Sequence, residues 1–114
     1  MIITVTLTCL IALIFAALGL AKVLALPKMR ELAAEAGFST AAYRRVGVLE
    51  LAGAAGVALG PAVPLLGGLA GAGLVLLLVG AAVVHLRKGD PVGRIAPAVV
   101  CAALVVGYLV ALFV

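Results

Sequence analysis

Long apolar stretches dominate this chain, and they constrain its fold more than any other feature of the sequence. Of its 114 residues, 68% are hydrophobic and only 11% are charged, whereas soluble domains are roughly half apolar and a quarter charged. A helix of roughly 20 apolar residues can cross the hydrocarbon core of a bilayer. The chain is therefore predicted to be an integral membrane protein, with room for four crossings and short connections.

Proline and glycine residues divide the apolar sequence into predicted membrane spans. A proline disfavours helical geometry in the residue before it, so the first span ends before Pro27, and the Gly60-Pro61 pair ends the second. We expect spans over residues 2–25, 46–59, 65–86 and 95–114, the second with a cytoplasmic extension from residue 40. Pro97 would lie in the first turn of the fourth span, where a proline is tolerated.

A short amphipathic helix is predicted between the first two spans. Pro27 suits its first turn, Gly37 suits a left-handed residue after its end, and Ser39 suits the N-cap of the next helix. Its apolar residues share one stripe that can lie in the membrane interface: Met29, Leu32, Ala33 and Ala36. The predicted fold is all-α: a membrane-embedded four-helix bundle with a short interfacial helix between the first two transmembrane helices, forming a single domain.

All eight basic residues lie near the connections that follow the first and third spans, which face the same side of the membrane. Cytoplasmic loops carry an excess of Lys and Arg. Residues 26–45 and 87–94 are therefore predicted to be cytoplasmic, with both termini outside, in a multi-pass protein of the plasma or inner membrane. Because this orientation accounts for the net charge of +4, no nucleic-acid partner is expected.

Glu50 is the residue that most strongly suggests a site. It lies five positions after Arg45, about 7.5 Å further along a helix, and therefore inside the hydrocarbon. Lys22 precedes Pro27 by five residues and reaches a similar depth. Charged groups at such depth normally face the bundle interior and pair. Lys22 and Glu50 could thus form a structural ion pair or belong to a functional pocket, and the sequence leaves both alternatives open.

Other polar residues are predicted to gather in the cytoplasmic half of the bundle. The candidate pocket consists of Lys22, Glu50, His85, Tyr43, Arg44, Arg45, Asp90 and Arg94. Tyr43 and Tyr108 fit interface anchors better than ligands of a bound group. Cys9 and Cys101 lie at different depths, so no disulfide is expected, and no Cys/His spacing fits a metal site.

The order of these features resembles the DoxX-like family of small four-helix membrane proteins. The matching segments cover nearly the whole chain: residues 19–22 (Gly-Leu-Ala-Lys), 26–30 (Leu-Pro-Lys-Met-Arg), 37–39 (Gly-Phe-Ser), 48–53 (Val-Leu-Glu-Leu-Ala-Gly) and 85–90 (His-Leu-Arg-Lys-Gly-Asp). The resemblance implies a four-helix bundle with Lys22, Glu50 and His85 at signature positions. Some relatives are associated with quinone-linked or thiol-linked oxidoreductase complexes, and a distant animal relative acts as an assembly chaperone for receptors.

Three functions are compatible with these features. The resemblance and the inner cluster favour an accessory or quinone-interacting subunit of a membrane redox system, with a non-covalent quinone and an oxidoreductase subunit or second copy as partners. A small proton-coupled transporter would use Glu50 as its proton carrier. A structural or chaperone protein would use the Lys22–Glu50 pair for packing alone. The sequence does not decide among the three, or whether the protein is catalytic.

Overall fold

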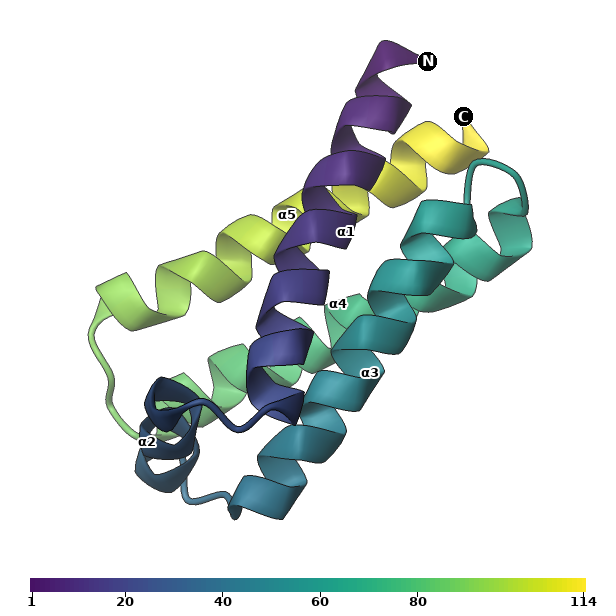
Figure 1. The fold of residues 1–114 in the computed structure, drawn as a ribbon. Coiled ribbons are helices and arrows are strands. Elements are labelled where there is room, and N and C mark those ends of the chain that lie inside the picture. Colours follow the sequence, from purple (N-terminus) through teal and green to yellow (C-terminus); the bar gives the residue numbers. More distant parts are fainter.

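The computed structural model describes all residues, 1–114, and is built from helices alone. The helices follow in chain order as α1 (Ile2–Val23), α2 (Pro27–Glu35), α3 (Thr40–Leu59), α4 (Pro64–Arg87) and α5 (Val92–Phe113). Helix α1 packs along α3, and α4 packs along α5. Contacts of α3 with α4 and of α1 with α5 join the two pairs (Figure 1). The predicted all-α fold is confirmed.

Three of the long helices have the length and apolar character of membrane spans. These are α1, α4 and α5, and an apolar helix is one of the two structures that can satisfy its backbone inside a bilayer. Helix α3 has 20 residues but carries Arg44, Arg45 and Glu50. The structure therefore contains three candidate spans where the sequence predicts four, and the charged residues of α3 account for the difference.

Local sequence signals explain where α2 and α3 begin and end. Pro27 occupies the first turn of α2, and Gly37 follows the helix with φ +79. The Ser39 hydroxyl accepts a hydrogen bond from the Ala42 N–H at 3.0 Å, which satisfies one of the free donors at the start of α3. These three predictions are confirmed.

Two helix ends differ from the expected ones. Helix α1 stops at Val23 because Ala25 adopts φ +51, and the N–H of Leu26 then donates to the carbonyl of Ala21 at 3.2 Å. This closing pattern normally uses glycine. Helix α5 begins at Val92 rather than at residue 95, so Pro97 lies inside the helix and not in its first turn.

Two glycines allow α1 and α3 to cross in backbone contact. A Cβ atom added at Gly47 would lie 2.7 Å from the Lys22 Cβ and 2.8 Å from the Gly19 carbonyl oxygen. A Cβ atom added at Gly19 would lie 2.8 Å from the Gly47 carbonyl oxygen. Small residues permit such close approaches between helices in membranes. The crossing brings the end of α1 beside the middle of α3, where Lys22 and Glu50 lie.

Tyr108 belongs to the core and is fully buried. Its hydroxyl donates to the Val57 carbonyl oxygen at 2.8 Å. That carbonyl also accepts a hydrogen bond from the Gly60 N–H. In a continuing helix it would also accept one from residue 61, four positions on, but Pro61 has no N–H. Tyr108 thus supplies a hydrogen bond that the proline removes from the end of α3. The expectation that Tyr108 anchors the protein at the membrane interface is wrong.

The close crossing predicts a specific sensitivity at Gly47. Gly47→Ala is expected to lower the free energy of unfolding by about 1–3 kcal/mol, since the new methyl group meets backbone that cannot move aside. In Gly73→Ala, the control, the new Cβ meets nothing within 4 Å and no loss is expected. Denaturant unfolding in detergent measures both variants, and equal losses would contradict the crossing.

Candidate functional site

Lys22 and Glu50 form a buried ion pair between α1 and α3. The Lys22 Nζ lies 2.5 Å from the Glu50 Oε1, and the two side chains are only 11% and 6% exposed. The ring of Tyr43 lies near the same ammonium, with its centroid 5.3 Å from Nζ, a distance at which a cation is attracted to the ring face. The structure therefore places together three of the residues that the sequence singles out.

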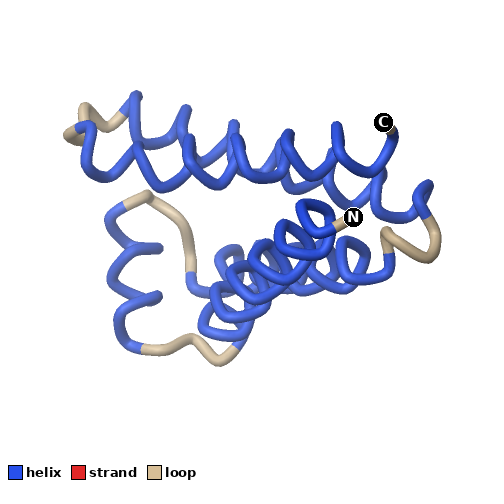
Figure 2. Tube along the Cα trace, turned by 90° about the horizontal axis from the view of Figure 1, so that it is seen from above, coloured by secondary structure: helices blue, strands red, loops and turns tan.

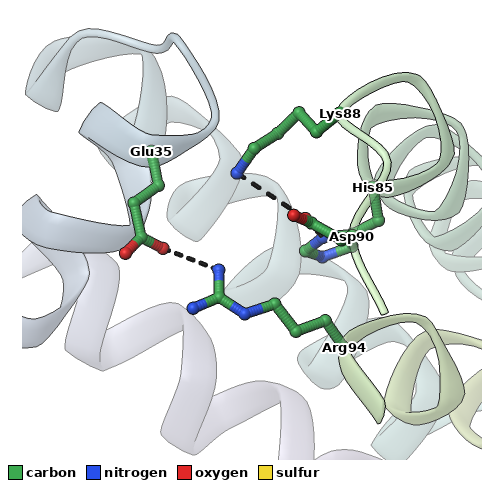
Figure 3. A network of polar contacts seen from close by, with 5 residues as sticks. All are labelled: Glu35, His85, Lys88, Asp90 and Arg94. Carbon is green, nitrogen blue, oxygen red and sulfur yellow. Dashed lines mark hydrogen bonds and ion pairs between the residues drawn. The ribbon is translucent and has the colours of Figure 1, made fainter. Parts of the chain in front are cut away.

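A second polar group lies where α4 turns into α5. The His85 Nδ1 lies 2.7 Å from the Asp90 Oδ2, and the Lys88 Nζ lies 3.6 Å from the same oxygen (Figure 3). Gly89, with φ +72, turns the chain so that the Asp90 N–H donates to the His85 carbonyl. Because an ionised carboxylate only accepts hydrogen bonds, the Nδ1 of His85 carries the shared proton.

A third ion pair joins two helices that are distant in sequence. The Arg94 Nη1, in α5, donates to the Glu35 Oε2, at the end of α2, at 2.8 Å (Figure 3). Both side chains are almost half exposed. The hydrogen bond and positive charge of Arg94 hold the pKa of Glu35 below its ordinary value. The carboxylate is therefore ionised at neutral pH and can pair with Arg94.

We call the region around these three ion pairs the charged end of the molecule. The carboxyl groups that form the pairs are Glu35, Glu50 and Asp90, and their cations are Lys22, Lys88 and Arg94. Each of these three carboxylates has a basic partner, so the six side chains together carry no net charge. The positive charge of the protein comes from other residues, outside these pairs.

A cleft of about 540 Å³ opens at the charged end. Residues of all five helices line it, among them Met29, Leu32 and Glu35 of α2. Fifteen of its 23 lining residues are hydrophobic, so its walls suit an apolar molecule. Its polar lining includes Lys22, Tyr43, Glu50, His85 and Arg94. A second hollow of about 530 Å³, on the α3–α4 face, is lined only by Leu, Ala and Gly residues.

The sequence-predicted residues divide into three groups. Five of the eight line the cleft: Lys22, Tyr43, Glu50, His85 and Arg94. Asp90 does not line the cleft but is hydrogen-bonded to His85. Arg44 and Arg45 are exposed and do not line the cleft, because residues next to Tyr43 in sequence point to other faces of a helix with 3.6 residues per turn.

Glu35 and Lys88 line the cleft although the sequence does not single them out. Glu35 is separated from its partner Arg94 by 59 positions, so no local pattern links them. The one available signal is the position of Glu35 three residues after Leu32, on the stripe of the predicted amphipathic helix.

Cys101 also lines the cleft, and both cysteines have free thiols.

The fold and this cleft define a class: small, multi-pass, α-helical membrane proteins with an amphipathic cleft at one end. The model of the DoxX-like family matches residues 6–107. The chain therefore belongs to the DoxX-like family, and the match includes every residue that lines the cleft. No curated protein and no solved structure gives a significant match.

The Asp90 carboxylate predicts a change in acid stability. The hydrogen bond from His85, together with the charge of Lys88, lowers the pKa of Asp90 below its ordinary value. A carboxyl group with a lowered folded-state pKa stabilises the fold above the unfolded-state pKa, about 3.9, and this contribution is lost as the pH falls further. Asp90→Asn should therefore lower Tm at pH 7, and this loss should shrink as the pH falls below about 3.9. Glu31→Gln, which removes an unpaired exposed acid, should change Tm little across the same pH range. A constant effect of Asp90→Asn across this range would contradict the pairing.

Proposed function

We propose that this protein is an accessory, quinone-interacting subunit of a membrane redox system. The observation that carries the proposal is the cleft, whose volume of about 540 Å³ lies within the roughly 300–1,000 Å³ typical of small-molecule sites. Its lining is mainly apolar, with a few polar groups at one end. A quinone has the same division, with an apolar tail and a ring that carries carbonyl oxygens.

The charge balance of the cleft favours an uncharged ligand. The carboxylates and the Lys and Arg side chains that line the cleft are all in ion pairs, so a charged ligand would have to break a pair. The quinone carbonyl oxygens need only hydrogen-bond donors, which the side chains of Lys22, Tyr43 and Arg94 carry. Electron transfer would then be the task of a partner oxidoreductase subunit, with this chain holding the quinone. A second copy of the chain is the other partner that the proposal allows.

We further propose that α3 also crosses the membrane, to give a four-helix bundle with α2 in the interface. The pairing of Glu50 with Lys22 supports this, because it removes much of the penalty of an acid within the hydrocarbon. Both termini lie at the end away from α2 (Figure 1). The Lys and Arg residues near α2 and the α4–α5 turn favour a cytoplasmic location for the charged end of a plasma- or inner-membrane protein.

A structural or chaperone role is the second candidate function. It is supported by the Lys22–Glu50 pair, since each group satisfies the other without a ligand, at a crossing set by Gly19 and Gly47. A proton-coupled transporter has less support. Beyond the cleft, the core contains fully buried side chains such as Val57, Val105 and Tyr108, which leave no visible path for a proton through the far half.

Quinone binding predicts a stabilisation that depends on the cleft. A short-chain quinone added to the purified protein at about 100 times its Kd should stabilise the fold by about 2.7 kcal/mol, measured as a rise in Tm. Gly80→Leu should abolish the rise, because Gly80 lines the cleft and has open space beside it. Gly73→Leu, equally open but outside this cleft, is the matched control.

Purification from native membranes supplies the second part of this test. The tagged chain should carry extractable quinone and co-purify with an oxidoreductase subunit. A protein that carries neither, and that quinone does not stabilise, would contradict the proposed function and leave the structural role.

A further inference from the structure

Helix α2 borders the charged end of the cleft but is held less firmly than the other helices. Met29, Leu32 and Glu35 of α2 line the cleft. Only Ala33 of this helix is buried, and its main helix-to-helix contact is with α3. Figure 2 shows the short helix standing apart from the long ones at one end of the molecule. A helix with so little buried surface can move without disrupting the core.

The two connections of α2 are suited to such a movement. Ala25, before the helix, has φ +51, and Gly37, after it, has φ +79. Both residues terminate a helix through backbone hydrogen bonds, so α2 is separated from α1 and α3 by a sharp turn at each end. Hinges in proteins are commonly a few residues at the ends of elements that absorb backbone rotation.

One side-chain hydrogen bond ties α2 to the rest of the molecule. It is the bond between Arg94 and Glu35, which connects α2 to the first turn of α5 (Figure 3), and both residues line the cleft. The two side chains are 44% and 46% exposed. An ion pair this exposed contributes little to stability and is screened by salt, so it can break and re-form readily.

We propose that α2 is a lid over the cleft and that the Glu35–Arg94 ion pair is its latch. While the pair is formed, α2 stays against the charged end of the cleft. When it breaks, α2 swings on its two connections and the cleft opens at the charged end to water and to a ligand. The identity of the ligand that enters the open cleft rests on the proposed function. The movement of α2 does not, because it follows from the few contacts that hold this helix.

A thiol inside the cleft gives a direct measure of opening. Cys101 lines the cleft and is partly buried, and the only other thiol, Cys9, lies in the far half of α1 and can be replaced by alanine. In a Cys9→Ala background in nanodiscs, a charged, water-soluble methanethiosulfonate reagent would reach Cys101 through the open cleft. Its modification rate then reports how often the lid opens.

Breaking the latch is expected to raise this rate. Glu35→Gln and Arg94→Gln should each increase Cys101 modification by about two- to fivefold, as loss of an exposed ion pair would allow. The charge exchange Glu35→Arg with Arg94→Glu should return the rate to near that of the parent. Glu31→Gln, which removes an exposed acid of α2 that has no ion-pair partner, should leave it unchanged. High salt should speed the parent but not Glu35→Gln.

Equal rates in all variants, or a charge exchange as fast as the single changes, would overturn the latch. The result is independent of quinone binding, which the rise in Tm measures on the same nanodiscs. A changed rate without a quinone effect keeps the lid and rejects the proposed ligand. A rise in Tm with quinone but no change in the modification rate would support the proposed ligand and reject the lid.

Discussion

A charged side chain inside an apolar helix assembly requires a partner, and this requirement organises the structure. The Glu50 carboxylate lies 2.5 Å from the Lys22 ammonium, with both side chains almost fully buried. Transfer of either charge alone into such surroundings is costly, whereas a well-placed pair recovers much of that cost. The pair forms because Gly19 and Gly47 let α1 and α3 approach in backbone contact. The crossing, the pair and the inner wall of the cleft are therefore one feature.

The cleft follows from how the remaining helices meet this crossing. Buried residues of α1, α3, α4 and α5, among them Phe15, Leu74 and Tyr108, form the core. Near the charged end the same helices line a cleft instead. Its ion pairs balance one another, which leaves hydrogen-bonding groups without net charge beside an apolar wall. That combination suits an uncharged amphipathic ligand and underlies the quinone proposal.

Much of the fold and part of the site could be predicted because they depend on short-range patterns. Pro27, Gly37 and Ser39 mark helix ends through local backbone chemistry. Counting residues from a proline and an arginine puts Lys22 and Glu50 at one level, and the structure shows them in contact. The left-handed Ala25 could not be predicted, since alanine gives no sign of that conformation. The Glu35–Arg94 and Tyr108–Val57 contacts also escape prediction, because the bonded residues are 59 and 51 positions apart in sequence. Such contacts depend on packing angles that no local pattern encodes.

The most direct test of the account is a double-mutant cycle at the central pair. Lys22→Met and Glu50→Gln, each alone, should lower the free energy of unfolding by about 3–5 kcal/mol, because each leaves the charge of the other residue buried without a partner. The double variant should lose clearly less than the sum of the two, while Lys28→Met, at an exposed lysine, should change little. Unfolding in detergent measures the parent and all four variants. Additive losses from Lys22→Met and Glu50→Gln would show that the two residues are not coupled and would contradict the account.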